Sequence, residues 1–182
     1  MVYENEIKGH FVKLRSITLE DAEFSYNLRK DPRFVSIMGQ PAATLEDQVK
    51  FIEWQMKQPG DYYFVVYDND NNKIGLIGVY DISGKCGEIG RTLNVGSPEQ
   101  TMETSLLLHD FAMKTLKLEK VTFVVYKQNK QQLSFHKKLG AEPIREVLRS
   151  GIPSYEYEVN LLYRDKYMDK IRKMLDKLVG NK

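Results

Sequence analysis

The sequence predicts an α/β (α+β) fold in which helices flank a mixed β-sheet. Strand-like segments, rich in β-branched and aromatic residues, alternate with helix-like segments along the chain. Several of the helix-like segments begin with recognisable start signals. The length of 182 residues suits one domain with one core. We therefore expect residues 1–182 to form a single domain, with a core at about 11–163 and an amphipathic C-terminal helix at about 164–179.

The first part of the chain predicts one strand followed by two helices. Residues 11–17 alternate in the manner of a half-buried strand. Thr18 and Thr44 each precede acidic residues, which favour the positive end of the helix dipole, so each is expected to be an N-cap. The second helix carries Trp54, for which core packing is the expected role. Between the helices we expect a loop at residues 33–43.

Three strands and a capped helix follow. The strands are expected at residues 62–67, 73–82 and 86–95. Asp and Asn residues at 68–72 favour a turn between the first two strands, and hence a hairpin. Ser97 has the position of an N-cap, Pro98 that of the first helical residue, and Gln100 completes a capping box. The helix is expected to continue through Leu116.

The last part of the chain predicts strand, helix, two strands and a final helix. Residues 121–126 form an apolar strand, and Asn129 opens a helix that ends at Gly140, a residue suited to a left-handed C-cap. Two strands are expected at 144–149 and 155–162. The final helix carries an apolar stripe at helical spacing.

Composition and charge narrow the classes of protein. The formal net charge of +2 is too small to indicate a nucleic-acid partner. No segment approaches the roughly 20 apolar residues of a membrane span, and the start lacks the pattern of a signal peptide, so we expect a cytoplasmic protein without a membrane partner. Cys86 is the single cysteine, and we expect a small core residue rather than a nucleophile. His, Asp and Glu are scattered, so no metal site is expected.

Three strings of sequence resemble the GNAT N-acetyltransferases, in particular the branch around the ribosomal-protein N-acetyltransferases. They are NKQQLSFHKKLGA at 129–141, the acid-Ile-Gly string that begins at Glu88, and VKLRSITLEDA at 12–22. The resemblance extends to about Tyr163. It implies an enzyme that moves the acetyl group of acetyl-CoA to a primary amine by direct transfer.

The cofactor loop departs from the family pattern. The family has a basic, glycine-rich loop of the form R-G-x-G-x-G/A before the third helix, whereas residues 95–101 keep only Gly96 and add the negative charge of Glu99. The departure leaves an alternative open, a non-catalytic acyl-CoA-binding or regulatory module with a degenerate phosphate loop.

The resemblance also implies where the cofactor binds. A gap between the strands at 88–95 and 121–126 would receive pantetheine, through backbone contacts of Leu93 and Val95. A pyrophosphate would need the helix start, where Ser97 and Thr101 offer hydroxyls in place of lost glycines, although Ser97 also suits a plain helix cap. Asn129 has the same two interpretations. The expected cofactor contacts are Leu93, Asn94, Val95, Gly96, Ser97, Thr101, Asn129 and Phe135.

Two residues are expected to carry the chemistry. Glu88 lies beside the expected thioester and would take the amine proton through water, or else it is a structural carboxylate in an ion pair. His136 matches a position where many members have Tyr, and it would give a proton to the leaving thiolate, or else it is a packing residue. His10 and His109 have no such context, and a structural role is expected for both.

The acceptor is the least defined part of the prediction. The loops at 33–43 and 149–154 should shape its pocket, with Phe34, Met38 and Tyr80 lining it. A protein N-terminus, a nucleotide-linked amino sugar and another small amine all remain open as the acceptor. A homodimer is an option that the sequence also leaves open.

Overall fold

Residues 1–35 and 41–180 are described by a computed structural model, apart from the side chains of 161–165 and 167, and within them the strands form one eight-stranded sheet. The strand order is β1-β2-β3-β4-β5-β6-β8-β7, in which β5 and β6 run parallel and the other neighbours run antiparallel. The strands are β1 (Ile7–Lys8), β2 (Val12–Ser16), β3 (Tyr62–Asp68), β4 (Lys73–Ser83), β5 (Cys86–Asn94), β6 (Lys120–Tyr126), β7 (Pro143–Arg149) and β8 (Ile152–Asn160).

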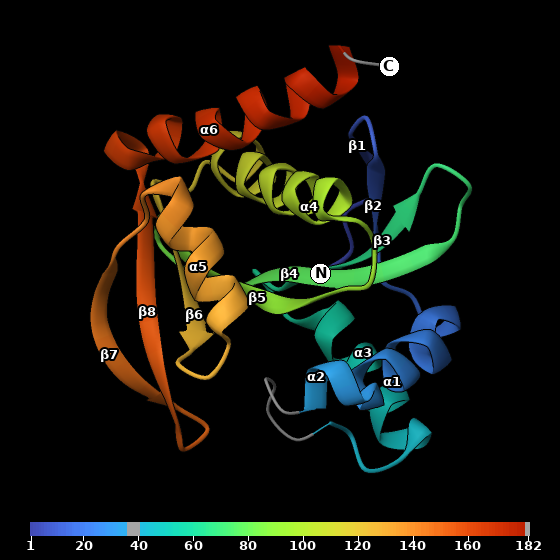
Figure 1. The fold of residues 1–182 in the computed structure, drawn as a ribbon. Helices are drawn as coiled ribbons and strands as arrows, with labels where there is room; N and C mark the ends of the chain where they lie inside the picture. The colour runs from blue at the N-terminus through green and yellow to red at the C-terminus, as the bar shows by residue number, and fades with distance from the viewer. Residues whose placement is uncertain (36–40, 181–182) are drawn as a thin grey trace.

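Helices cover both faces of the sheet (Figure 1). They are α1 (Ala22–Lys30), α2 (Pro32–Val35), α3 (Leu45–Lys57), α4 (Pro98–Asp110), α5 (Lys130–Leu139) and α6 (Leu161–Gly180), with a 3₁₀ turn at Leu19–Asp21 before α1 and a π-helical turn at Phe111–Thr115 after α4. The mixed α/β fold predicted from the sequence is thus confirmed.

The helix starts follow the capping signals of the sequence. Thr18, Thr44 and Ser97 each form a capping box with the residue three positions later. Each box satisfies backbone N–H groups that have no partner in the first turn of a helix. At the other end of α5, Gly140 has a φ of 83°, a left-handed conformation that a residue with a side chain rarely adopts.

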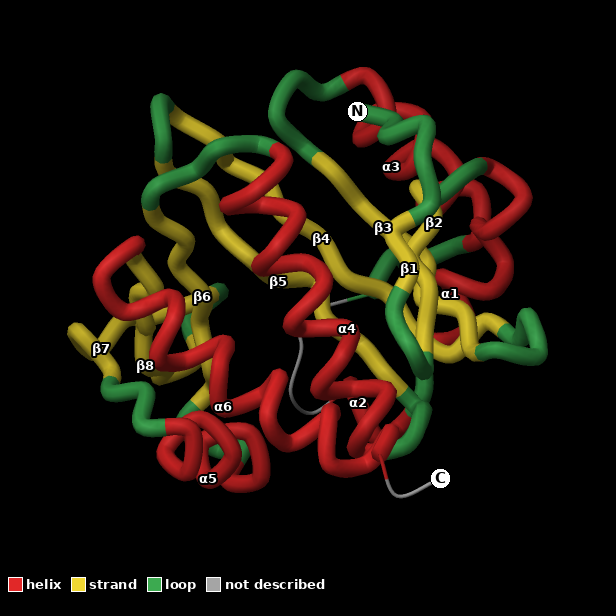
Figure 2. The backbone as a smooth tube through the Cα atoms, turned by 90° about the horizontal axis from the view of Figure 1, so that it is seen from above, coloured by secondary structure: helices red, strands yellow, loops and turns green. Residues whose placement is uncertain are grey.

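Two apolar clusters lie on opposite faces of the sheet. The larger joins the sheet to α4, α5 and α6 through residues such as Leu108, Leu139 and Ile171. The smaller packs α1 and α3 on the other face and includes Leu28 and Ile52. Figure 2 shows α4 lying over the middle strands of the sheet. Among residues 1–35 and 41–180, none of the helices has both the length and the apolar character that a bilayer crossing needs.

A buried carboxylate fastens the turn between β1 and β2 to α4. Glu103 has 2% of its surface exposed. Its oxygens accept hydrogen bonds from the backbone N–H groups of His10, Phe11 and Val12, at 2.8, 2.6 and 2.9 Å. A β-carbon added at Gly9 would meet this carboxylate at 2.3 Å, so glycine is required for the close approach. One side chain therefore satisfies three backbone donors that a tight turn leaves over.

Some element boundaries differ from the prediction. Part of the expected loop at 33–43 belongs to the short helix α2, which begins at Pro32 because proline suits the first position of a helix. The strand expected to reach Leu162 ends at Asn160, and α6 begins at Leu161 rather than at about 164. The two-residue strand β1 and the π-helical turn were not predicted, because neither has a local sequence signal.

Two side-chain placements were also predicted wrongly. Trp54 is 51% exposed, because α3 turns the face of Gln48, Ile52 and Gln55 toward the core and Trp54 projects from a different face. Cys86 is exposed at the first position of β5, where the strand has just left a turn, so it is not a core residue.

Candidate active site

The middle of the sheet splits between β5 and β6. The two strands pair at Cys86, Gly87 and Glu88, opposite Lys120, Val121 and Thr122. Within the described residues the pairing stops there, while β5 continues to Asn94 and β6 to Tyr126. Strands that diverge leave backbone N–H and C=O groups facing the space between them, and an extended ligand with amide groups can pair with such groups. The expected gap is therefore present.

Glu88 stands at the point where the strands separate, and its carboxylate is held by two other side chains. The Tyr80 hydroxyl donates a hydrogen bond to Glu88 Oε1 at 2.6 Å. The Arg149 guanidinium donates to both oxygens, from Nη2 to Oε1 at 2.5 Å and from Nη1 to Oε2 at 3.1 Å. The side chain of Glu88 is 16% exposed and that of Arg149 is 41% exposed. The structural ion pair weighed for Glu88 in the sequence is thus present.

The environment of Tyr80 keeps its hydroxyl protonated. Burial raises the pKa of Tyr80 above its usual value, and the negative charge of Glu88 raises it further. The ring leaves little room beside it, because a β-carbon added at Gly90 would lie 2.3 Å from the Tyr80 oxygen. Tyr80 thus serves as a hydrogen-bond donor to Glu88 at neutral pH.

A bulge in β5 lies directly beyond this cluster. Between the pairs Gly78–Gly90 and Leu76–Leu93, β4 advances two residues and β5 three, and Arg91 has a φ of 53°. The extra residue moves the following side chains to the opposite face. Consequently Ile89 packs in the larger cluster and Leu93 in the smaller one, although regular alternation would place them on one face.

The bulge aims Arg91 at a second ion pair beneath Tyr80. Its Nη1 and Nη2 donate to the two oxygens of Asp61 at 2.6 and 2.8 Å. Its guanidinium carbon lies 4.2 Å from the centroid of the Tyr80 ring. Burial lowers the pKa of Arg91, but the bond to Asp61 outweighs this effect and raises the pKa overall. Two neighbouring guanidinium–carboxylate pairs therefore surround the tyrosine.

Along the end of β5, the backbone N–H and C=O groups of successive residues face β4 and β6 in turn. The Val95 N–H donates to Ile74 O at 2.8 Å, so this amide already serves the ladder with β4. Because amide directions alternate along a strand, the N–H and C=O of Asn94 face away from β4, toward β6. Leu93 is buried, whereas Val95 is 37% exposed.

The start of α4 uses its own side chains to satisfy its amides. The Ser97 oxygen accepts from Gln100 N at 3.3 Å, and Gln100 Oε1 accepts from Ser97 N at 2.8 Å. Gly96 N donates to Asn94 Oδ1 at 2.7 Å, and Thr101 N donates to Ser97 O at 2.9 Å. The expected cap at Ser97 is thus confirmed. A pyrophosphate would have to replace some of these bonds in order to bind here.

An acidic hollow lies on another side of the same helix start. It encloses about 370 Å³ between α4, the β3–β4 turn and the end of α6, and is lined by Phe11, Asp68, Asn69, Asp70, Ser97, Glu99, Gln100 and Leu178. Three carboxylates repel an anion. This hollow is therefore a poor place for a phosphate group.

α5 brings three of the expected residues to the β6 side of the split. Asn129 caps the helix, its Oδ1 accepting from Gln132 N at 3.1 Å, and its contact with a cofactor stays a prediction. His136 is buried, with its ring 4.6 Å from that of Phe123 and 5.4 Å from that of Tyr157. Phe135 packs edge-on against His136 at 5.5 Å.

Burial keeps both interior histidines neutral. Burial, with a smaller effect of the nearby His109, lowers the pKa of His136 to about 4. Burial also lowers the pKa of His109 to about 4, against a hydrogen bond to Ser105 O at 2.8 Å. At neutral pH roughly one His136 ring in 10³ carries a proton. This ring is therefore a neutral imidazole in the folded protein.

The expected acceptor residues are placed unequally. Tyr80 lies at the split, as described above. Phe34 is half-buried and packs against the smaller cluster. Met38 lies outside the described residues. In the described part of the chain, no group of three or more His, Cys, Asp or Glu side chains is placed to hold a metal ion.

Comparison with known families identifies the family of this chain. A family model described as Acetyltransferase (GNAT) domain matches residues 12–142, which is well over half of the chain. The chain belongs to the GNAT acetyltransferase family. The match includes β5, the split, the start of α4 and all of α5, whereas Arg149 at the end of β7 lies beyond it.

One curated GNAT relative matches at the level of sequence. The SPbeta prophage-derived uncharacterized N-acetyltransferase YokL of Bacillus subtilis is 30% identical over 95 residues. This match covers 50% of the chain and 53% of YokL, so it spans about half the length of that relative.

Solved GNAT structures share the fold at low sequence identity. FdhC, a nucleotide-linked sugar GNAT, has a TM-score of 0.76 and 23% identity, with 95% of this chain and 98% of the other covered. Spermidine N-acetyltransferase from Vibrio cholerae, in complex with CoA and spermine, has a TM-score of 0.73 and 17% identity, with 86% and 98% covered. A GCN5-related N-acetyltransferase from Brucella melitensis has a TM-score of 0.78 and 12% identity, with 95% and 86% covered.

Two residues of this GNAT site were missed in the sequence. Arg149 belongs to a segment expected to shape the acceptor pocket, but nothing near it indicates a partner 61 positions earlier. Arg91 gave no local signal, because β5 also carries Glu88, Thr92 and Asn94, and the bulge at Arg91 depends on the pairing of both strands.

Proposed function

We propose that the protein transfers the acetyl group of acetyl-CoA to a primary amine by direct attack of the amine on the thioester. The observation that carries the proposal is the split of β5 from β6 directly after Glu88, in a chain of the GNAT family. The split offers a strand-like slot that ends beside a carboxylate. Attack by an amine needs this combination of an extended binding slot and a nearby proton acceptor.

The residues around the split fit an acyl-CoA. Asn94 would present backbone groups to the pantetheine amides, and the partly exposed Val95 would border the slot, whereas the Leu93 side chain packs in the smaller cluster. The start of α4, with Gly96, Ser97 and Thr101, would meet the pyrophosphate, and Asn129 and Phe135 would border the slot from α5. Acetyl-CoA supplies the activated acetyl group. The protein residues have the separate task of orienting it and of moving protons.

Glu88 is the proposed base. The amine nitrogen forms a bond to the acetyl carbon, the carbon–sulfur bond breaks, and the proton lost by the amine passes to the Glu88 carboxylate directly or through water. The Tyr80 hydroxyl fixes the position of the carboxylate at 2.6 Å. Arg149 holds both oxygens, so it must release at least one of them when the acceptor binds.

His136 is proposed to assist the leaving sulfur. Because the imidazole is neutral at neutral pH, it would donate an N–H hydrogen bond to the thiolate, as a tyrosine hydroxyl does, and the thiolate would then take its proton from water. The buried aromatic setting also supports a packing role, and the two roles predict different effects of substitution.

Two structural neighbours support a class of acceptor. FdhC is a nucleotide-linked sugar GNAT, and the Vibrio cholerae neighbour is a spermidine N-acetyltransferase. Both act on amines of small molecules. A small-molecule amine is therefore the acceptor that we propose, ahead of the protein N-terminus that the resemblance to the ribosomal-protein branch suggests.

Binding and turnover of acetyl-CoA test the proposal. Acetyl-CoA at about 100 times its dissociation constant should stabilise the folded protein by about 2.7 kcal/mol, measured by thermal unfolding. An acceptor panel then tests for release of free thiol above the rate without acceptor. A protein that neither shifts its unfolding nor shows calorimetric binding with millimolar acetyl-CoA would refute the proposed cofactor.

A non-catalytic acyl-CoA-binding module is the second candidate. The specific observation in its favour is the start of α4, where side-chain caps occupy the amides that a pyrophosphate needs. This candidate predicts that acetyl-CoA binds but that no amine increases thiol release. It also predicts that acetyl-pantetheine, which lacks the pyrophosphate, binds about as tightly as acetyl-CoA.

A further inference from the structure

Arg149 connects two parts of the sheet that are not neighbours. It ends β7, whereas Glu88 lies on β5, and β6 and β8 stand between these strands in the sheet order. The turn after Arg149 has left-handed φ values at Ser150 and Gly151. The end of the β7–β8 hairpin therefore lies close enough to β5 for the Arg149 guanidinium to pair with the Glu88 carboxylate. An acceptor that contacts the Glu88 carboxylate must therefore compete with Arg149 for it.

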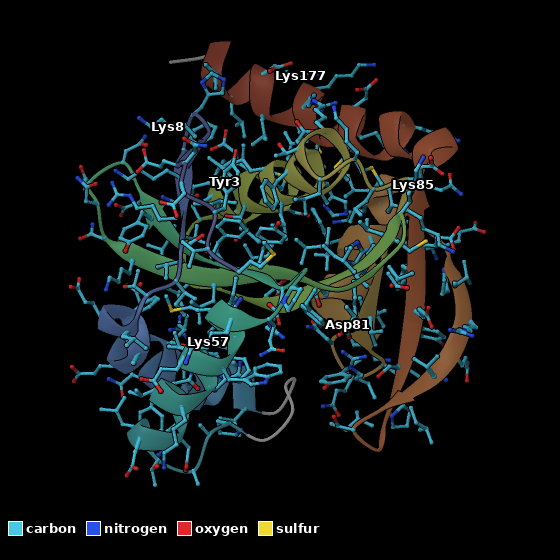
Figure 3. All side chains as sticks on the ribbon, turned by 180° about the vertical axis from the view of Figure 1, so that it is seen from behind. Tyr3, Lys8, Lys57, Asp81, Lys85 and Lys177 are labelled. Carbon is cyan, nitrogen blue, oxygen red and sulfur yellow. The ribbon has the colours of Figure 1, made fainter. Side chains whose placement is uncertain are left out.

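The charges around Glu88 are balanced in pairs. Arg149 neutralises Glu88, and Arg91 neutralises Asp61 beneath the Tyr80 ring. The two carboxylates and two guanidinium groups together carry no net negative charge that would attract a polycation. The guanidinium groups also repel a polycation. The exposed Asp81, drawn between α3 and the β7–β8 hairpin in Figure 3, is a further carboxylate next to Tyr80.

The same arrangement suits a ligand that carries both charges. An ammonium group alone must separate Glu88 from Arg149 and leave the guanidinium without its carboxylate. A ligand with a carboxylate next to its amine exchanges partners instead. Its ammonium group takes the place of Arg149 at Glu88, and its carboxylate takes the place of Glu88 at Arg149. The planar guanidinium matches a carboxylate with two parallel hydrogen bonds, as it does now with Glu88.

We propose that Arg149 is a specificity-determining residue that selects acceptors with a carboxylate adjacent to the primary amine, the chemistry of an α-amino acid. The inference rests on the proposed acetyl transfer and narrows its acceptor class. Arg149 holds the acceptor carboxylate, which frees Glu88 for the ammonium group. The spermine-binding neighbour, by contrast, acts on an acceptor without a carboxylate.

The test compares acceptors that differ only in the carboxylate. Thiol release from acetyl-CoA is measured for the full chain with a panel of α-amino acids, with the carboxamide of each, and with spermidine. We expect kcat/KM to be at least about 10-fold higher for the acid than for its amide. Arg149→Gln should remove this preference and bring the ratio to about 1, mainly by raising KM for the acid.

Arg145→Gln is the matched control. Arg145 lies on the same strand and pairs with Glu156 across to β8 at 2.7 Å, so its loss removes an ion pair of the same kind away from Glu88. The acid-to-amide ratio of this variant should equal that of the wild type. A structural effect of either substitution lowers both rates together and leaves the ratio unchanged.

A thermal unfolding measurement on the wild-type protein tests the inference even if the Arg149 variant does not fold. With CoA present, the amino acid should raise the unfolding temperature more than its amide does. If kcat/KM is equal for the acid and its amide, or higher for spermidine than for both, the inference is overturned while acetyl transfer stands. A preference for spermidine would point to the Asp81 carboxylate as its binding group. Failure of every acceptor to increase thiol release overturns acetyl transfer itself, and the inference with it.

Discussion

Glu103→Ala should destabilise the protein strongly, although Glu103 lies outside the active site. The substitution removes the acceptor of three backbone N–H groups in the β1–β2 turn. A hydrogen bond to a charged group contributes about 1.5–3 kcal/mol when buried. The bond from Val12 is buried and the other two are partly buried, so we count about 2 kcal/mol for the first and about 1 kcal/mol for each of the others.

The expected loss in the free energy of unfolding is therefore about 4 kcal/mol, a large share of the roughly 5–15 kcal/mol of a typical domain. Urea unfolding followed by circular dichroism measures it, with Glu53→Ala on the exposed face of α3 as the control, for which a change within about 0.5 kcal/mol is expected. A loss for Glu103→Ala no greater than that of the control would show that water replaces the carboxylate, and the reasoning would be refuted.

The remaining predictions concern the histidines and the proposed base. Between pH 6.5 and 4 the unfolded chain holds more protons on His109 and His136 than the folded protein does. Lowering the pH through this range should therefore reduce the free energy of unfolding, by up to roughly 3 kcal/mol for each histidine. Urea unfolding at several pH values measures this loss. His136→Phe should slow thiol release and His136→Tyr should restore part of the rate, whereas equal rates for all three would leave His136 a packing residue. Glu88→Gln should slow transfer about 10²–10⁴-fold with nearly unchanged acetyl-CoA affinity, while the control Glu156→Gln keeps the rate.

Much of the fold was predictable because its signals are local. The capping boxes that begin at Thr18, Thr44 and Ser97 each depend on residues three positions apart, and all three form. The left-handed end of α5 depends on one residue, Gly140. Trp54 shows the limit of such signals, since the face of α3 that is buried depends on what packs against it.

The candidate site was predictable in part. The resemblance indicated Glu88, the gap beside it and the start of α4, and the structure brings these together at the split. The position of a register change was not predictable, because a bulge such as that at Arg91 depends on the pairing of both strands and not on one of them. The same bulge decides which face Leu93 occupies.

By itself, then, the sequence determined the order of the longer helices and strands, their caps and the resemblance to the family, because each depends on residues near one another in the chain, as in the string at 129–141. Only the tertiary structure decided that β5 and β6 part after three pairs, that His136 is buried among aromatic rings, and that Arg149 reaches Glu88 across 61 positions. The reason is physical. The charge of a guanidinium acts on whatever carboxylate the folded sheet brings within hydrogen-bond distance, and that distance is set by strand order and curvature.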